Sequence, residues 1–271
     1  MLLVLAGGSA GLAHAHLEVI SNADAPRVFF GERKVISVTL HNPSAQEFNA
    51  EIRTRIYQTS SATAVPVSEA AWKTLRVLPH QAVLETVSLN FPAVKAETRY
   101  IVQWLDDTNV IGKTEVLVYP TNLLAELKPL LDGETVGVLD PNDKLKPLLR
   151  QNGVTFTDLG QTALENFSGR LAILGPFRSK AQLPEDVAKR TKAMAKNGVA
   201  IVWLQPPPGP REKLQPSYYS VAAGTNTIVV AQSSLVVDLP ELPQSQLHLL
   251  RLCRLALHPE PPALPESNPQ P

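Results

Sequence analysis

The hydrophobic pattern of this chain changes near Pro120, and this change constrains the fold more than any other feature of the sequence. Before it, apolar and polar residues alternate with a period of two, as they do from Val35 to Leu40. After it, short apolar runs alternate with segments of helical spacing. The sequence therefore predicts an all-β domain, a linker helix and an α/β domain, over residues 16–119, 120–133 and 134–257.

The first domain reads as about seven short strands at roughly ten-residue spacing, which is typical of a β-sandwich with one buried and one solvated face. In its order of strands it resembles the immunoglobulin-like accessory domains of bacterial surface proteins and multidomain glycosidases. Such domains serve as spacers or binding modules. The residues expected inside the sandwich are Ile36, Val38, Leu40, Ile52, Ile56, Leu84, Val87, Leu89, Tyr100, Val102, Trp104, Val116 and Val118.

Two features of this first domain allow a functional interpretation. Trp72 follows Glu69 in a polar stretch that reads as a loop, so its ring either stacks on a sugar or packs against the protein. Arginines at positions 53, 55, 76 and 99 form either a basic stripe or cross-strand ion pairs with Glu51, Glu85 and Glu97. We favour packing for the tryptophan and pairing for the arginines.

The second domain alternates strands and helices, which predicts right-handed crossovers and a three-layer fold around a parallel sheet. An antiparallel hairpin, turning at residues 224–226, follows the fourth strand. The expected strands are Thr135–Leu139, Val154–Leu159, Leu171–Leu174 and Val199–Leu204, with helices at Lys144–Gln151, Pro184–Lys196 and Gln244–Leu257.

This order of elements resembles a flavodoxin-like sheet, and more closely the class I glutamine amidotransferase-like fold. In the active members of that family, a Gly-x-Cys-x-Gly elbow after the fourth strand presents the nucleophile. The corresponding stretch here reads IVWLQPPPGP, and Gln205 stands where the nucleophile would be. The prolines that follow lack the backbone N–H groups of an oxyanion site. His248 and His258 have no carboxylate at a triad-like spacing, so we expect no catalytic centre.

One loop of the second domain could bind a ligand. Asp140, Asn142 and Asp143 follow its first strand, and Gly175 follows its third. Ligands of open parallel sheets bind beyond the carboxyl ends of such strands. The competing interpretation is that Asp140 or Asn142 caps the helix that starts near Lys144. A carboxylate-dependent hydrolase, using Asp140 and Asp143, is the alternative enzymatic hypothesis.

Charge and cysteine content exclude several classes of function. Twenty-five basic residues balance 25 acidic ones, whereas nucleic-acid binders carry a basic surplus. Cys253 is the single cysteine, so neither an intramolecular disulfide nor a cysteine-rich zinc site can form. Its place on an apolar stripe indicates a buried, inert thiol. We expect no metal, no cofactor, no nucleic-acid partner and no integral membrane span.

The two ends of the sequence suggest export. Residues 1–15 read MLLVLAGGSAGLAHA, which matches a signal peptide cleaved before His16; a buried strand or helix is the alternative. The proline-rich tail, residues 258–271, is expected to be disordered. The chain is therefore interpreted as a non-catalytic scaffold or binding module of the bacterial envelope, periplasmic or extracellular, whose partner is a glycan or an envelope protein. An accessory subunit of an envelope enzyme fits the same features, and no oligomeric state follows from them.

Overall fold

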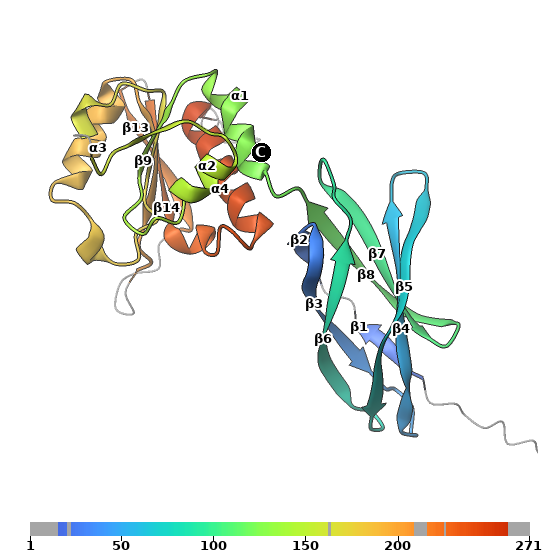
Figure 1. Ribbon diagram of the computed structural model, residues 1–271. Coiled ribbons are helices and arrows are strands. Elements are labelled where there is room, and N and C mark those ends of the chain that lie inside the picture. The colour runs from blue at the N-terminus through green and yellow to red at the C-terminus, as the bar shows by residue number, and fades with distance from the viewer. Residues whose placement is uncertain (1–15, 21–22, 162–163, 209–215, 225, 260–271) are drawn as a thin grey trace, which may run out of the picture. The chain divides into compact units, whose positions relative to one another are not determined.

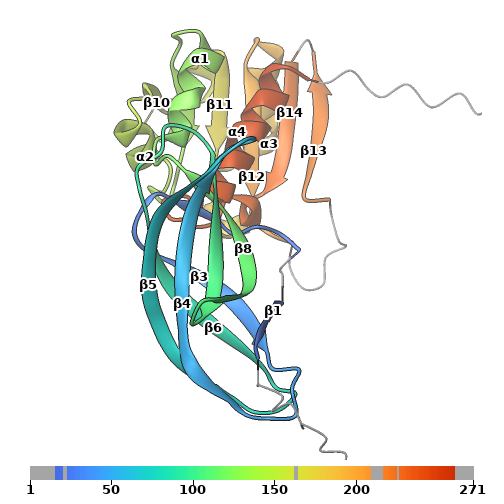
Figure 2. The same cartoon turned by 90° about the vertical axis from the view of Figure 1, so that its right-hand side faces the viewer.

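The computed structural model describes residues 16–20, 23–161, 164–208, 216–224 and 226–259, and the chain divides into two compact units, residues 1–120 and 121–271. The segment interpreted as a signal peptide and nearly all of the proline-rich tail lie outside the described residues. Figures 1 and 2 show both units, with the strands of the first in blue to green.

The described part of the first unit is built from strands in two sheets. The smaller sheet has three strands in the order β1-β3-β6, and the larger has five in the order β2-β8-β7-β4-β5. The strands are β1 (Glu18–Ile20), β2 (Arg27–Phe29), β3 (Gly31–His41), β4 (Phe48–Thr59), β5 (Ala64–Val77), β6 (Ala82–Phe91), β7 (Thr98–Asp106) and β8 (Asn109–Tyr119).

Both sheets contribute to one apolar core, because alternate residues of each strand point inward. Ile36 from the small sheet and Ile52, Val102 and Val116 from the large one belong to the same buried cluster. Trp104 is completely buried, and its indole N–H donates to Thr114 Oγ1 at 2.9 Å. The polar end of this large side chain is therefore satisfied inside the unit.

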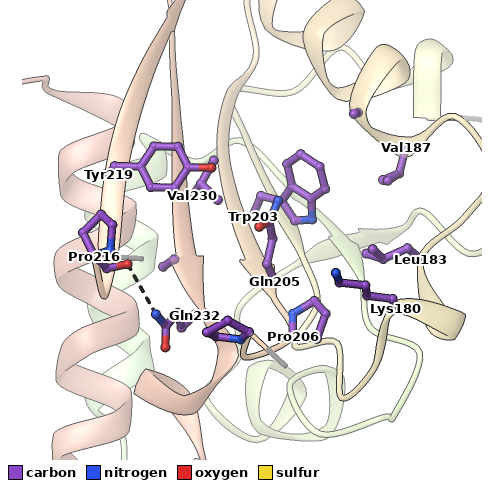
Figure 3. Close-up of a pocket in the computed structure, with 13 residues that line it drawn as sticks. Lys180, Leu183, Val187, Trp203, Gln205, Pro206, Pro216, Tyr219, Val230 and Gln232 are labelled. Atoms are coloured by element: carbon purple, nitrogen blue, oxygen red, sulfur yellow. Dashed lines mark hydrogen bonds between the residues drawn. The ribbon is translucent and has the colours of Figure 1, made fainter. Parts of the chain in front are cut away.

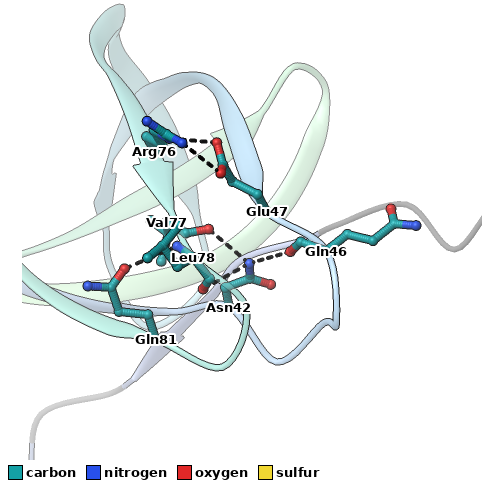
Figure 4. A network of polar contacts seen from close by, with 7 residues as sticks. All are labelled: Asn42, Gln46, Glu47, Arg76, Val77, Leu78 and Gln81. Carbon is teal, nitrogen blue, oxygen red and sulfur yellow. Dashed lines mark hydrogen bonds and ion pairs between the residues drawn. The ribbon is translucent and has the colours of Figure 1, made fainter.

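Asn42, at the end of β3, ties the turns of the first unit together (Figure 4). Its buried Nδ2 donates to the carbonyl oxygens of Gln46 at 2.7 Å and Val77 at 3.0 Å, and its Oδ1 accepts from Ser44 N at 3.0 Å. Beside it, Arg76 pairs with both carboxylate oxygens of Glu47. A turn residue in the sequence thus satisfies backbone groups of two separate segments.

The second unit contains one six-stranded sheet with helices on both faces. The strand order is β10-β9-β11-β12-β14-β13. Figure 1 shows α3 on one face and α1, α2 and α4 on the other. The elements are β9 (Val136–Leu139), β10 (Phe156–Asp158), β11 (Leu171–Leu174), β12 (Ala200–Gln205), β13 (Tyr218–Ala223), β14 (Asn226–Gln232), α1 (Leu127–Leu131), α2 (Lys146–Gln151), α3 (Val187–Lys196), α4 (Pro243–Leu257) and the 3-10 turns η1 (Leu123–Glu126), η2 (Leu164–Asn166), η3 (Lys180–Gln182) and η4 (Ser233–Val236).

The predicted fold class, an immunoglobulin-like sandwich followed by a parallel three-layer domain, is wrong. The structure has three sheets, and two of them mix parallel and antiparallel pairs. In the first unit β2 runs parallel to β8, because the short N-terminal strand adds to the large sheet alongside its last strand. In the second unit β13 runs antiparallel to β14, as the predicted hairpin requires, so that sheet is also mixed.

Two predictions for side chains of the first unit are also wrong. Leu84 was expected in the core but is 72% exposed, because it pairs with Thr39 on the outward face of the small sheet. Trp72 was expected in a loop but lies within β5, which extends from Ala64 through Pro66 to Val77.

Candidate functional site

Asp140 lies directly after β9 and is buried. Its Oδ2 accepts from the backbone N of Leu145 at 2.6 Å and of Lys146 at 3.1 Å, and its Oδ1 accepts from Asn142 N at 3.3 Å. The N–H groups of Leu145 and Lys146 are at the start of α2, where they have no partner within the helix, and that of Asn142 belongs to the loop before it. The carboxylate of Asp140 thus caps α2.

Asn142 joins the loop after β9 to the loop after β11. Its Nδ2 donates to Pro176 O at 2.7 Å, and its Oδ1 accepts from Gln182 Nε2 at 2.9 Å. Gly175, before the cis peptide bond to Pro176, has a φ of +106°, and a Cβ there would lie 2.6 Å from Leu204 O. The structure therefore brings Asn142 and Gly175 to the same edge of the sheet, where the bonds of Asn142 close the two loops on each other.

Asp143 and Lys146 extend this edge toward β10. Lys146 Nζ lies 3.4 Å from Asp143 Oδ1 and 2.9 Å from Asp158 Oδ2. The Lys146 hydrogen bond holds the pKa of Asp158 below its usual value, against the opposing effect of burial. Asp143 is mostly exposed, whereas Asp140 is buried and bonded to three backbone N–H groups. This is not the arrangement of two carboxylates that share a substrate.

Trp72, the sugar-stacking candidate of the first unit, packs against the core. Its ring lies edge-on to Trp104, with the ring centroids 5.0 Å apart and the planes at 61°. Trp72 is only partly exposed and belongs to the margin of the buried cluster. The structure thus gives the ring a packing role.

A cleft that the sequence did not indicate lies on the α3 face of the second unit (Figure 3). Its floor is formed by side chains of β12, β14 and β13, and the pairing register of these strands decides which side chains lie next to each other. Trp203 on β12 pairs with Val230 on β14, which pairs with Tyr219 on β13. Two residues further toward the carboxyl ends of β12 and β14, and on the same face, Gln205 pairs with Gln232. An aromatic row and an amide row therefore lie side by side.

The other wall of this cleft comes from the segment between β11 and β12. Val187 begins α3 and Leu183 precedes it, and in Figure 3 Lys180 lies below both of them, near Pro206. The enclosed volume is about 310 Å³. Ligand pockets span about 300–1,000 Å³, so this cleft accommodates a small molecule or one residue of a larger one.

The cleft contains a buried hydrogen-bond donor that lacks a partner. Trp203 Nε1 is enclosed, and no acceptor for it is present in the part of the chain that the structure describes. An unsatisfied buried N–H costs free energy until it meets an acceptor. Gln232 Nε2, at the same end, lies 3.4 Å from Pro216 O. Trp203 Nε1 is therefore an unsatisfied donor shielded within the wall of the cleft, while other atoms of Trp203 line the cleft itself.

The described lining of the cleft combines apolar and neutral polar side chains with one cation. The described residues of the cleft are apolar apart from Trp203, Gln205, Tyr219, Gln232 and Lys180, and they include no carboxylate, histidine or cysteine. No group of three or more His, Cys, Asp or Glu side chains among the described residues is arranged to hold a metal ion. Nor does any helix of the described chain have the length and apolar character needed to cross a membrane.

A second hollow, of about 470 Å³, lies at the carboxyl edge beside Asn142 and Pro176. Its outer wall is the segment after β14, and its exposed charges are of both signs, with Arg178 facing the same hollow as Asp238. The side-chain amide of Asn142, which lines this hollow, already donates to Pro176 O and accepts from Gln182 Nε2. We place the candidate site in the α3-face cleft because the unpartnered donor lies there.

Comparison with known proteins gives no family. No family model matches the chain, and no curated protein matches it. Among solved structures, an alkylpurine DNA glycosylase of Pseudomonas fluorescens bound to DNA is 15% identical over 39% of this chain and 31% of its own, with a TM-score of 0.31. A β-glucosidase of Listeria innocua is 15% identical over 39% of this chain and 16% of its own, with a TM-score of 0.29. The chain spans less than a third of either, and neither likeness bears on function. The resemblance to amidotransferase-like domains stays a prediction.

Proposed function

We propose that this chain is an exported, non-catalytic binding module of the bacterial envelope, and that the α3-face cleft holds a neutral glycan. The observation that carries the proposal is the pairing of an aromatic row with an amide row on one sheet face. Export rests on the sequence pattern of residues 1–15.

A sugar ring fits both rows of the cleft. It has an apolar face of C–H groups, which packs against aromatic rings, and a rim of hydroxyl groups, which both donate and accept hydrogen bonds. Trp203 and Tyr219 supply the aromatic surface, and Gln205 supplies an amide that donates and accepts. Lys180 is the single charged side chain in the described lining. The other polar groups are neutral, which suits a neutral ligand.

The test is isothermal titration calorimetry with a panel of neutral oligosaccharides. We expect one class to bind. Trp203→Leu, which removes the aromatic ring and keeps an apolar side chain, should then weaken binding about fivefold, the equivalent of about 1 kcal/mol of aromatic packing. Gln205→Leu should weaken binding by a similar factor, because the leucine cannot bond a hydroxyl.

Gln151→Leu is the matched control, because Gln151 is exposed at the end of α2, outside the cleft. Its affinity should equal that of the unmodified chain. The glycan assignment is wrong if no neutral oligosaccharide binds, or if binding is equal in all three variants.

A further inference from the structure

β13 is an edge strand without the features that keep edges from pairing. In the described residues it pairs only with β14, and its sequence, YYSVAA, contains no charge and no proline. Tyr218, Tyr219 and Val221 are 36%, 40% and 38% exposed. Figure 2 shows this strand at the border of the sheet, beyond β14. A long, exposed, uncharged edge is a template for another strand.

Other edges of the molecule carry such protection. β5, at one edge of the large sheet, contains Pro66 and Lys73. β6, at one edge of the small sheet, carries Glu85, which pairs with Lys73. β10, at the opposite edge from β13, is only three residues long and ends in a charged residue, Asp158. β13 lacks each of these features, so its free edge is available for pairing.

The register of the hairpin determines which backbone groups point outward. Gln232 N donates to Ser217 O at 2.9 Å, so Ser217 faces β14. Backbone groups alternate along an antiparallel strand, so Tyr218, Ser220 and Ala222 direct their N–H and C=O away from β14. Three consecutive outward residues, centred on Ser220, thus offer six backbone groups to a partner.

We propose that β13 pairs antiparallel with β13 of a second copy of this chain, about a two-fold axis through Ser220. This register pairs all three outward residues: Ser220 with its own equivalent, and Tyr218 with Ala222 of the second copy. A shift of two residues in either direction leaves outward groups unpaired.

The side chains of β13 fit this self-pairing on both faces. On the α4 face a large residue, Tyr218, meets a small one, Ala222 of the second copy. On the α3 face Tyr219 meets Val221 of the second copy, an aromatic and β-branched pair that stabilises antiparallel strands. Tyr218 is already ordered, because Arg251 lies 5.7 Å from its ring centroid and donates to its hydroxyl at 3.3 Å.

Charge does not oppose this association. The strand is uncharged, so its own side chains bring no like charges together across the axis, and the chain as a whole has a net charge of zero. Self-repulsion between two copies is therefore weak. An isologous contact of this kind closes on itself and gives a dimer.

The experiment is oxidative cross-linking of a single-cysteine probe in the full chain. In the proposed register the two Ser220 Cα atoms are about 5.5 Å apart, as in a hydrogen-bonded antiparallel pair, which lies within disulfide range. Ser220→Cys should therefore form a covalent dimer. Ala222→Cys is the matched control, because its two Cα atoms would be more than about 13 Å apart, the span of four strand residues. The native Cys253 is buried and gives no background.

Sedimentation velocity gives a second measurement. The 29.4 kDa chain should sediment as a dimer. Ser220→Pro removes an outward N–H without touching the β14 ladder, and should weaken dimerisation at least tenfold. A monomer at concentrations up to about 1 mM contradicts the proposal. So does cross-linking of Ala222→Cys that equals or exceeds that of Ser220→Cys. The cysteine variants retain every backbone group, so a folding defect in the proline variant leaves the test intact.

Discussion

At the residue scale, Asn42 connects backbone groups of two separate segments of the first unit. Its amide group bonds Gln46 O, Val77 O and Ser44 N, and its exposed surface is zero. Asn42→Ala removes the Asn42 donor from the buried carbonyl oxygen of Val77, at a cost of about 1–3 kcal/mol, whereas Gln46 O keeps a hydrogen bond from Ser44 Oγ. We expect the free energy of unfolding of the first unit to fall by about 2–3 kcal/mol, measured by urea denaturation.

Asn49→Ala is the control for this variant, since Asn49 is exposed on β4. Its unfolding free energy should stay within about 0.5 kcal/mol of that of the unmodified chain. If the two variants are equally stable, Asn42 does not hold the turns together.

Single residues also show what alternation predicts and where it was misapplied. The inward positions of β3 and β7 follow from a strict period of two, and Ile36, Val38, Val102 and Trp104 are buried as expected. Leu84 and Val87 are three positions apart, so their side chains lie on opposite faces of the strand and both cannot be buried. The arginines at 53, 55, 76 and 99 form ion pairs, as favoured, but with the glutamates at positions 69, 47 and 115. Choosing among those glutamates requires the register of β4 with β5 and of β7 with β8.

At the scale of elements, the ion pair between Lys146 and Asp158 joins α2 to β10, and it is largely shielded from solvent. The pKa of Asp158 is lowered from 3.8 in the folded chain, chiefly by the Lys146 hydrogen bond. The folded state therefore binds this proton less tightly than the unfolded state. The resulting stabilisation is complete above the unfolded pKa and is lost as the pH falls through the folded pKa.

Asp158→Asn tests this link, because the amide retains an oxygen for Gly160 N, which Asp158 Oδ1 bonds at 2.9 Å. The variant should be less stable than the unmodified chain at pH 7, and the difference should shrink as the pH falls below about 4. Denaturant titrations of both proteins at pH 7, 5 and 3 measure the effect. A constant difference across this range would mean that the charge of Asp158 does not stabilise the fold.

The elements themselves were largely predictable, but their assembly was not. Helical spacing and the Asn197-Gly198 stop predicted α3, and the turn at Gly224 predicted the hairpin of β13 and β14. The length of β5 was missed, because Pro66 reads as a break although an edge strand tolerates it. The parallel pairing of β2 with β8 joins segments about 90 residues apart, which no local pattern specifies.

The candidate cleft was missed for a similar reason. Sequence analysis identified Gln205 only as the position where the nucleophile of active amidotransferases is missing. It assigned no role to Trp203 or Tyr219. They share a row only because β12, β14 and β13 pair in one particular register. The available signal was the repeated Gln at the end of two strands, Gln205 and Gln232. The cap interpretation of Asp140, by contrast, needed only local spacing and is confirmed.

At the scale of the whole molecule, each unit has its own buried cluster. We therefore expect calorimetry to show two unfolding transitions instead of one. Asn42→Ala should lower the midpoint of one transition by roughly 10 °C, at about 4–8 °C per kcal/mol for a unit of this size. Gly175→Ala should lower only the other, because its Cβ meets Leu204 O in the second unit. A single transition, moved by both variants, would show that the units unfold together.

The edge-to-face packing of Trp72 on Trp104 makes these two indoles an optical label. Rings this close, with centroids 5.0 Å apart, couple their electronic transitions and give a paired positive and negative band in circular dichroism. The third tryptophan of the chain, Trp203, lies in the cleft of the second unit, so its fluorescence emission responds to that unit. Two spectroscopic signals from native residues thus report on the two halves of the chain separately, without any added dye.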